Sequence, residues 1–511
     1  MALSCQGDST IMSVILNKLT TDKQEVMNIM CMQGRNEETG LMYASNNGHS
    51  TILKLCLYFL PPSQRHKLLS MGDKDGRNAL YYAASNGHVQ SVKTILQSVT
   101  ESERIALVGS ADNYKWTSLH IAAHGGHHNF VIELLNGLNA KKRLELLKLK
   151  EAKGWNPLHF AALHGRHETV SLILSSLDEC DRLNYLLEKE NSQTALHLAC
   201  QQGHSSVIEA ILNHVKDSEI VDFILEREDD GWTSLALSVH LKMSPDTLRC
   251  VIDYIPAAKR FQSLCVSSNK GWNTLHRAVA DGSPDVVTAI IELLDMDNMQ
   301  RLLFAKTHDG STSLLLAAQH NHFHTAKILL HYIEPAARWG YIKEKSKADQ
   351  TAIHKSAYHG FHETLAVLLA NIHSQKTDRW YLVEEPTGKA FSPLQCAVLS
   401  GDTCSVDLIM QFFSAEERLP FILEKSSSGL TLAHYAALAM FNKQQKYPGK
   451  QLPTDVIQAN KRSIDNVMKY VPSNQQKAYL AVRNNENYLA EELANGKYDG
   501  KKYKTLLGWI C

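Results

Sequence analysis

The chain has 511 residues, and lysine plus arginine balance aspartate plus glutamate at 53 each. This neutral balance argues against a nucleic acid or an anionic membrane surface as the partner. No segment reaches the roughly 18 apolar residues of a membrane span, and residues 1–20 lack the basic start and apolar core of a secretory signal. The ten cysteines are scattered without a CxxC pair, which predicts reduced thiols in a cytoplasmic protein without cofactors.

The segment 1–38 is expected to form an N-terminal cap. Residues 1–10 look loose, and the apolar stretch from Ile11 to Leu19 is similar to the second helix of the units that follow. A stack of repeats needs a terminal unit that covers its exposed packing face. We therefore interpret residues 1–38 as a truncated repeat.

One pattern then recurs from residue 39 to residue 440, at intervals of about 40 residues. Each copy is centred on an apolar anchor residue. The anchors are Leu41, Leu80, Leu119, Leu158, Leu196, Leu235, Leu275, Leu314, Ile353, Leu394 and Ala433. A near-constant period of this length predicts eleven copies of one structural unit.

Each unit reads as a helix, a tight turn and a second helix. Two residues before every anchor stands Thr, Asn or Ser, as at Thr117, which can accept a hydrogen bond from the first helical turn. Three residues after the anchor stands Ala or Ser, which allows neighbouring helices to approach closely. Seven residues after the anchor, eight units carry the glycine that ends a helix, as at Gly126. An apolar pattern with helical spacing follows, as in Val131, Leu134 and Leu135.

The segment between units predicts a third, short linker helix. Nine of the ten linkers carry an arginine followed by apolar residues one turn later. These arginines are Arg65, Arg104, Arg143, Arg182, Arg260, Arg301, Arg338, Arg379 and Arg418. Because the residue recurs at the same place, we expect its guanidinium to bond nearby carbonyl or carboxylate oxygens, the alternative being a ladder for an acidic ligand.

Two units depart from the pattern. Unit six replaces histidine with Ala236 and glycine with Lys242, and Pro245 opens its second helix, so the stack is expected to be irregular there. In unit eleven a polar insertion at 441–453 interrupts the repeat. Helices follow at 454–511. They end in a degenerate capping repeat with Asn487 as its cap and Leu489 as its anchor, in which Glu491 and Glu492 oppose further stacking.

The segments TSLHIAA at 117–123, NPLHFAA at 156–162, TALHLAC at 194–200 and NTLHRAV at 273–279 resemble the ankyrin repeat. The resemblance implies an all-α ankyrin-repeat solenoid of about eleven helix-turn-helix units with capping units at both ends. It also implies protein binding through a concave groove, without catalysis.

Histidine is abundant directly after the anchor, as at His120, and after the turn glycine, as at His127. The resemblance implies that these imidazoles bond neighbouring helices and loops, since buried polar groups are normally paired. The alternative is metal binding by His320, His322, His324, His359 and His362. These histidines span a helix end and show no cysteine or carboxylate partner at ligand spacing along the sequence, so no metal site is assigned.

No catalytic motif is present. The sequence contains no phosphate-binding glycine loop, no GxSxG and no HExxH. Cys180 and Cys404 lack a base fixed beside them in the sequence. The alternative function, an enzyme or metal-binding protein that uses the histidine-rich face or the C-terminal segment, has no catalytic residue assigned.

An aromatic residue stands three positions before the anchor in five units. These residues are Trp116, Trp155, Trp232, Trp272 and Phe391. The ankyrin resemblance places this position at the base of the turn, facing the groove, and Trp is enriched in interface hot spots. A polar rim is expected from Tyr114, Lys153, Asp230, Lys270, His124, His164 and His240. The alternative is that each indole lies on the adjacent turn and seals the stack.

Units of about 40 residues with a linker helix also resemble the ankyrin-repeat effectors of intracellular bacterial pathogens. That resemblance implies delivery by a type IV secretion system into a eukaryotic cell, where a monomer binds a host protein in the cytoplasm. Glu486, Glu491, Glu492, Leu507 and Trp509 would fit the C-terminal signal of such effectors.

Overall fold

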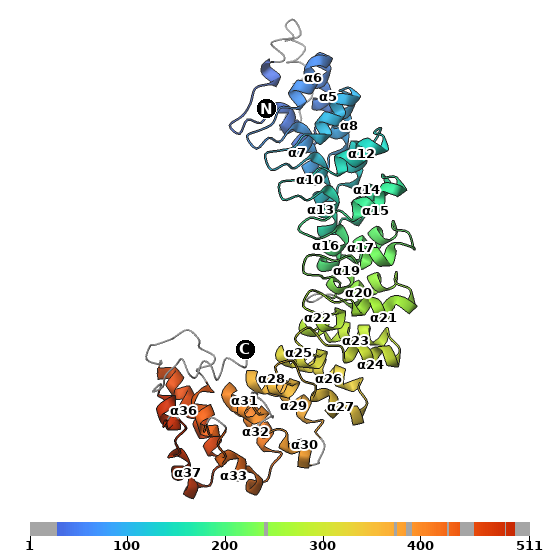
Figure 1. The fold of residues 1–511 in the computed structure, drawn as a ribbon. Coiled ribbons are helices and arrows are strands. Elements are labelled where there is room, and N and C mark those ends of the chain that lie inside the picture. The colour runs from blue at the N-terminus through green and yellow to red at the C-terminus, as the bar shows by residue number, and fades with distance from the viewer. Residues whose placement is uncertain are drawn as a thin grey trace. The chain divides into compact units, whose positions relative to one another are not determined.

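The computed structural model describes residues 28–239, 244–372, 376–384, 391–426, 429–439, 454–485 and 487–495. Over these ranges the protein is helical, and extended pairing is limited to isolated bridges such as Ala111 with Thr117. Each repeat consists of a first helix, a second helix and a short linker helix, as Figure 1 shows. The expected all-α solenoid of helix-turn-helix units with a linker helix is thereby confirmed. Residues 1–27 of the predicted cap and the predicted insertion at 441–453 lie outside the described ranges.

The described helices fall into three classes. The first helices are α4 (Gly40–Asn46), α7 (Ala79–Ser85), α10 (Ser118–Gly125), α13 (Pro157–Leu163), α16 (Ala195–Gln202), α19 (Ser234–Leu237), α22 (Thr274–Ala280), α25 (Ser313–Gln319), α28 (Ala352–His359), α31 (Pro393–Ser400) and α34 (Leu432–Ala437). The second helices are α5 (Ser50–Phe59), α8 (Val89–Gln97), α11 (His128–Leu135), α14 (His167–Ser175), α17 (Ser205–Leu212), α20 (Pro245–Ile252), α23 (Pro284–Glu292), α26 (Phe323–His331), α29 (His362–Leu369), α32 (Thr403–Met410) and, after the insertion, α36 (Thr454–Met468). The linker helices are α6 (Pro62–Leu69), α9 (Glu101–Gly109), α12 (Ala140–Leu147), α15 (Glu179–Leu186), α18 (Ile220–Ile224), α21 (Ala257–Cys265), α24 (Met296–Leu303), α27 (Pro335–Ile342), α30 (Lys376–Trp380), α33 (Ala415–Leu423) and α37 (Ser473–Leu480), and α38 (Ala490–Ala494) comes last.

The core follows the repeat. First helices pack on first helices of the next unit, as α10 does on α13, and second helices pack on second helices, as α11 does on α14. Every anchor residue is buried, Leu119 completely, and so is every small residue three positions later, such as Ala122. All eleven residues expected as caps, such as Thr117, occupy the N-cap of a first helix. The small side chains remove the steric barrier to close helix approach, so burial of the anchors supplies the main stabilisation.

The histidine after the anchor connects one repeat to the next. The backbone N–H of Thr117 donates to Nδ1 of His120 at 3.2 Å, which requires Nδ1 to be the unprotonated nitrogen. Nε2 therefore carries the proton and donates to the carbonyl of Trp155 at 3.0 Å. His197 and His276 make the same pair of bonds, to the carbonyls of Glu226 and Ala305. The structural role expected for these histidines is thus observed.

The turn after each first helix needs a left-handed residue. Seven residues after the anchors, glycines such as Gly87 (φ 67°) adopt this conformation, and Asn321 takes it at φ 59° where unit eight has no glycine. Asparagine tolerates this region better than other non-glycine residues. Its side-chain Oδ1 also accepts a bond from Thr364 of the next repeat at 2.9 Å. The apparent exception at position 321 therefore keeps the turn.

The linker arginines bond to backbone carbonyls, which agrees with their expected structural use. Nε of Arg182 donates to Leu174 and Leu177, and Nε of Arg418 donates to Met410. Arg143 and Arg379 reach carbonyls of the following repeat, at Ser176 and Phe412. The guanidinium thus donates to carbonyls at the ends of second helices, which have no partner within the helix.

The irregularity of unit six coincides with a division of the chain. The chain divides into two compact units, each with most of its contacts inside itself. The first comprises Met1–Val239 and Met243–Lys259, and the second comprises His240–Lys242 and Arg260–Cys511. The first helix of unit six, α19, has only four residues, although Thr233 still caps it and Pro245 still opens α20. Lys242 lies outside the described ranges.

The C-terminal capping repeat has a different register from the one expected. The sequence pattern suggested Leu489 as the anchor, but Leu489 is the N-cap of α38, and its N–H donates to Glu492 at 2.9 Å. Glu492 therefore takes the place that histidine holds in other units. The error arose because a polar cap was expected two residues earlier, at Asn487, which instead adopts φ 69° in the turn.

Substitution of Gly87 by Ala should lower the melting temperature. The backbone there is left-handed, and an added Cβ would lie 2.5 Å from Nδ1 of His127. The conformational cost alone is about 1–2 kcal/mol. The matched control is Gly340→Ala within α27, where an added Cβ meets no atom within 4 Å. Thermal unfolding should show a loss for Gly87→Ala and no loss for Gly340→Ala, and equal losses would contradict the steric explanation.

The buried histidines should make stability depend on pH. Burial lowers the pKa of His120, His159, His197, His276 and His354 to about 4. Between about pH 6.5 and 4 the unfolded chain then binds more protons than the folded chain, so stability falls as the pH falls through this window and is unaffected above it. Each histidine contributes a slope of about 1.4 kcal/mol per pH unit.

His197→Gln tests this origin, because Gln395 holds the equivalent position in unit ten and accepts the N–H of Ser392 at 2.9 Å. The variant should lose some stability at pH 7 but show a shallower decline of melting temperature from pH 7 to 5 in calorimetry. An unchanged decline would show that the buried imidazole is not the source.

Candidate functional site

The aromatic positions lie at the end of each turn that precedes a first helix. The carbonyl of Trp116 accepts the N–H of Asp112 at 2.9 Å, and the carbonyl of Trp155 accepts the N–H of Glu151 at 3.0 Å. Neighbouring turns also bond to each other, since the N–H of Ala152 donates to the carbonyl of Tyr114 at 3.0 Å. These bonds fix the spacing of the aromatic side chains from one repeat to the next.

Three rings form what we call the aromatic cluster: Trp116, Trp155 and Phe160. The ring centroids of Trp116 and Phe160 are 4.3 Å apart, and those of Trp155 and Phe160 are 5.3 Å apart. Both indoles are half-buried, whereas Phe160 is 7% exposed. The two indoles therefore flank Phe160 and keep part of their surface open to solvent.

Phe160 is a member of the cluster that was not among the predicted site residues. It follows the anchor Leu158 by two residues, on the first helix of unit four. Its size was not a distinguishing signal, because Tyr43 and Tyr82 hold the same position in units one and two, whereas Ile121, Leu198 and Leu237 hold it in units three, five and six. Only the packing of α13 beside the two turns shows that its ring joins the indoles.

Polar side chains predicted for the rim lie on the same repeats as the aromatic cluster, and the ring of His124 contacts those of Trp116 and Phe160. His124 and His164 are exposed, and their ring centroids lie 4.2 Å apart. Burial, and secondarily the positive charge of Arg166, lowers the pKa of His124, while burial and then His124 lower that of His164. Tyr114 is 59% exposed at the turn tip, and Lys153 is exposed at the next tip. This rim offers neutral imidazoles, one phenol and one ammonium group.

The remaining predicted residues do not join this cluster. In the first compact unit Trp232 is half-buried and Asp230 exposed, at a turn two repeats beyond Trp155. Trp272, Lys270 and Phe391 belong to the second compact unit, where the ring of Phe391 contacts that of Tyr435 at 5.4 Å. His240 lies outside the described residues.

The indole N–H of Trp155 is shielded from solvent, and no acceptor for it occurs in the part of the chain that the structure describes. A buried donor without a partner costs about 1–3 kcal/mol. A side chain selected only to seal the stack would not need to carry this donor.

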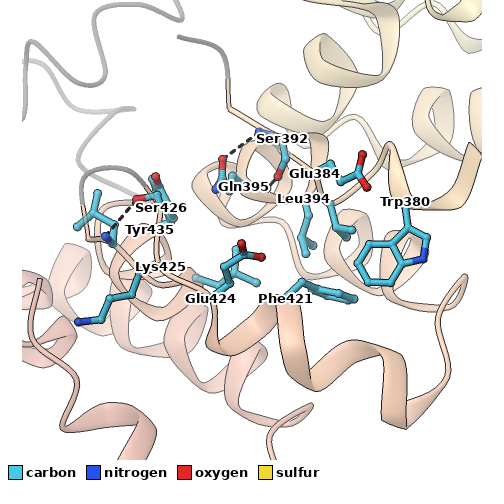
Figure 2. A pocket seen from close by; sticks show the side chains of 13 residues that line it. Trp380, Glu384, Ser392, Leu394, Gln395, Phe421, Glu424, Lys425, Ser426 and Tyr435 are labelled. Atoms are coloured by element: carbon cyan, nitrogen blue, oxygen red, sulfur yellow. Dashed lines mark hydrogen bonds between the residues drawn. The ribbon is translucent and has the colours of Figure 1, made fainter. Parts of the chain in front are cut away.

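A separate cavity of about 310 Å³ lies in the second compact unit (Figure 2). Trp380 and Phe421 form one wall, and Glu384 and Glu424 contribute carboxylates. Several of its polar groups already serve the fold, since Gln395 accepts the N–H of Ser392 and Ser426 accepts that of Leu430. These groups cap α31 and close a turn, so the cavity gives no assignment of a ligand.

The histidines considered for metal binding do not come together as a set. Nε2 of His322 donates to the carbonyl of Ala280 at 2.9 Å, a structural bond between repeats. His362 instead lies beside Asp402 and Cys404 of the next repeat. The absence of cysteine and carboxylate partners inferred from spacing is wrong for His362, because its partners lie a full repeat away along the chain and only stacking brings them near.

The cysteines and helices agree with two further expectations. The eight cysteines in the described ranges are free thiols. Among the helices that the structure describes, none is long and apolar enough to cross a membrane.

Comparison with known families identifies the repeat. A family model of three ankyrin repeats matches residues 1–106, 104–184, 244–338 and 275–379, and a single ankyrin repeat matches residues 191–226. The ankyrin repeat domain of Bcl-3, described as a unique member of the IkappaB protein family, is 19% identical, with a TM-score of 0.36 over 46% of this chain and 91% of its own. The human ASB11 ankyrin repeat domain is 18% identical, with a TM-score of 0.35 over 50% of this chain and 96% of its own.

No curated protein matches the sequence. The two structures share the repeat but are too distant to indicate a partner. The family models, in contrast, cover more than half of the chain. The matched ranges contain most of the repeat helices described above. The chain belongs to the ankyrin-repeat family.

Proposed function

We propose that the protein is a non-enzymatic scaffold that binds a protein partner through the face formed by its first helices and the turns before them. Ankyrin repeats generally mediate protein–protein interactions. The observation that carries the proposal here is the aromatic cluster, in which Trp116 and Trp155 remain half-buried beside Phe160. Half-exposed indoles within a polar rim have the composition of an interface hot spot.

The arrangement favours binding because it is preorganised. The turn of Trp116 is held by its own hydrogen bond and by the side chain of Asp112, whose Oδ1 accepts the N–H groups of Tyr114 and Trp116 at 2.9 and 2.8 Å. A rigid backbone reduces the ordering cost that a partner would otherwise meet on binding. Large rings with few rotatable bonds add contact area at little further cost in entropy.

The competing role is sealing of the stack. The contact of Trp116 with Phe160 joins units three and four, so removal of the indole should affect stability as well as binding. Tyr114 separates the two roles, because it is 59% exposed at the turn tip and contributes little to the core. His124 is also exposed, so a substitution there likewise separates an effect on binding from an effect on stability.

Trp116→Ala and Trp155→Ala should each weaken partner binding by about 2 kcal/mol or more, which is roughly thirtyfold. Tyr114→Ala should weaken binding with no change in melting temperature. The measurement is affinity capture from host-cell lysate, followed by titration of the captured protein against each variant. The matched control is Tyr58→Ala, which removes a 77% exposed tyrosine from the second helix α5.

The partner should be retained by the wild type and by Tyr58→Ala. The docking face would be refuted if the Trp variants had a lower melting temperature but bound the partner as the wild type does, and if Tyr114→Ala left the affinity unchanged. That result would establish the sealing role. A partner that is turned over, and whose modification depends on a single cysteine or histidine, would refute the non-enzymatic part of the proposal.

We further propose that the protein is a monomeric effector of the kind that intracellular bacterial pathogens deliver by type IV secretion. The support is the unit length of about 40 residues together with a linker helix in each unit. A fusion to a reporter enzyme active only in host cytoplasm should give a signal that depends on the secretion system and on residues 486–511. A signal that survives loss of the secretion system would refute delivery, and a concentration-dependent mass in light scattering would refute the monomer.

A further inference from the structure

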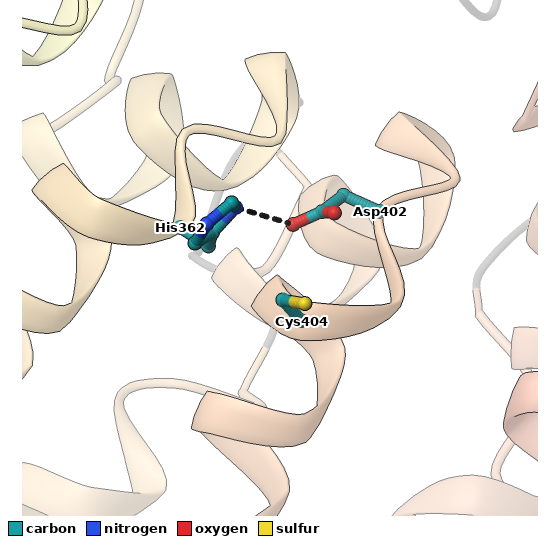
Figure 3. Close-up of side chains that lie close together, drawn as sticks. All are labelled: His362, Asp402 and Cys404. Atoms are coloured by element: carbon teal, nitrogen blue, oxygen red, sulfur yellow. Dashed lines mark ion pairs between the residues drawn. The ribbon is translucent and has the colours of Figure 1, made fainter.

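His362, Asp402 and Cys404 form a cluster outside the aromatic face, where unit nine meets unit ten (Figure 3). His362 is the first residue of α29, Asp402 is the N-cap of α32, and Cys404 is the second residue of α32. The potential ligand atoms of the three side chains all lie within 4.8 Å of one another. Three different ligand types thus converge from two repeats.

The spacing within the cluster suits a metal ion better than a hydrogen bond. Nδ1 of His362 lies 3.6 Å from Oδ2 of Asp402, beyond hydrogen-bonding distance. A tetrahedral zinc ion with bonds of about 2.0–2.1 Å to nitrogen and oxygen and 2.3 Å to sulfur separates its ligand atoms by about 3.3–3.6 Å. The observed separation of 3.6 Å between imidazole and carboxylate is a few tenths of an ångström above the value of about 3.3 Å for a nitrogen and an oxygen ligand. The thiol of Cys404 lies within 4.8 Å of both other ligand atoms.

The position of Asp402 is fixed by the fold. Its Oδ2 accepts the N–H of Ser405 at 2.9 Å and the hydroxyl of Ser405 at 2.6 Å. Its Cβ packs against the left-handed turn at Gly360, where an added Cβ would lie 2.8 Å away. Oδ2 is also the oxygen that lies 3.6 Å from Nδ1 of His362, so the capping bonds orient the carboxylate toward the imidazole. The carboxylate is therefore held in place before any ion binds.

The register of the stack also favours the site. In units three and four the residues equivalent to His362 and Cys404 are His128 and Glu168, and Nδ1 of His128 lies 2.8 Å from Oε2 of Glu168. The stack therefore brings these two positions into direct contact when their side chains are complementary. In units nine and ten they hold imidazole and thiol, with a carboxylate at the preceding N-cap.

We propose that His362, Asp402 and Cys404 form a binding site for a divalent transition-metal ion of the zinc class. Nitrogen and sulfur donors select such ions over calcium or magnesium, which prefer oxygen. Three protein ligands leave a fourth position open to water or to a group from a partner. The bound ion links α29 to α32 and so joins two neighbouring repeats, a role separate from the proposed docking face.

The test uses the full-length, tag-free, reduced protein with Co²⁺ and Zn²⁺ as probes. Co²⁺ should give a near-ultraviolet sulfur-to-cobalt charge-transfer band at one equivalent, and Zn²⁺ should remove it. His362→Ala and Cys404→Ser should each abolish the band or weaken Zn²⁺ affinity at least about tenfold in competition with a chromogenic chelator, because loss of a ligand exceeds the usual effect of an outer-shell change. Both residues are exposed, so the variants should keep their melting temperature.

The matched controls are His167→Ala and Cys180→Ser. His167 begins α14 as His362 begins α29, but the next repeat offers His204 and Ser206 where the site has Asp402 and Cys404. Cys180 is an exposed thiol that joins no group of three metal-ligating side chains among the described residues. Both controls should bind as the wild type does. Absence of the charge-transfer band, unchanged affinity in Cys404→Ser or His362→Ala, or equal losses in the controls would each overturn the proposal.

Discussion

Close contact between successive first helices is the constraint on which the structure depends. A small residue three positions after each anchor, such as Ala122, is completely buried, and a larger side chain there would separate the helices. At that distance the imidazole of His120 can reach from its own N-cap to the carbonyl of Trp155 in the next repeat. Apolar burial brings the repeats together, and the neutral histidine then fixes their register with directional bonds.

That register explains why the turns can present side chains in a regular array. The carbonyl that His120 bonds belongs to Trp155, a residue of the aromatic cluster. The same residue thus contributes its backbone to the stack and part of its ring to the surface. Its shielded N–H without an acceptor in the described chain suggests a compromise between these two demands. Such local conflicts are expected where a side chain serves a purpose besides stability.

The same regularity can bring together chemistry that no single repeat contains. The stack places the start of a second helix beside the start of the second helix in the next repeat. The contact that forms there depends on which side chains occupy these two positions. An imidazole and a glutamate give an ion-pairing contact at His128 and Glu168. An imidazole, a carboxylate and a thiol give the cluster at His362, Asp402 and Cys404. Because repeat proteins tolerate substitution at such exposed positions, new sites can arise there without a change in fold.

The sequence by itself determined the repeat, the caps, the left-handed turns, the linker helices and the structural use of most histidines. These features are local or strictly periodic, so a pattern of side-chain types suffices to reveal them. It failed at Leu489, where a degenerate cap carries no polar signal, and the tertiary structure supplied the register. Only the tertiary structure decided that Phe160 lies between two indoles and that His362 meets Asp402 and Cys404. Those contacts join residues of different repeats. Their distances depend on how α13 and α32 pack against the neighbouring repeats, and the spacing of residues along the chain does not reveal that packing.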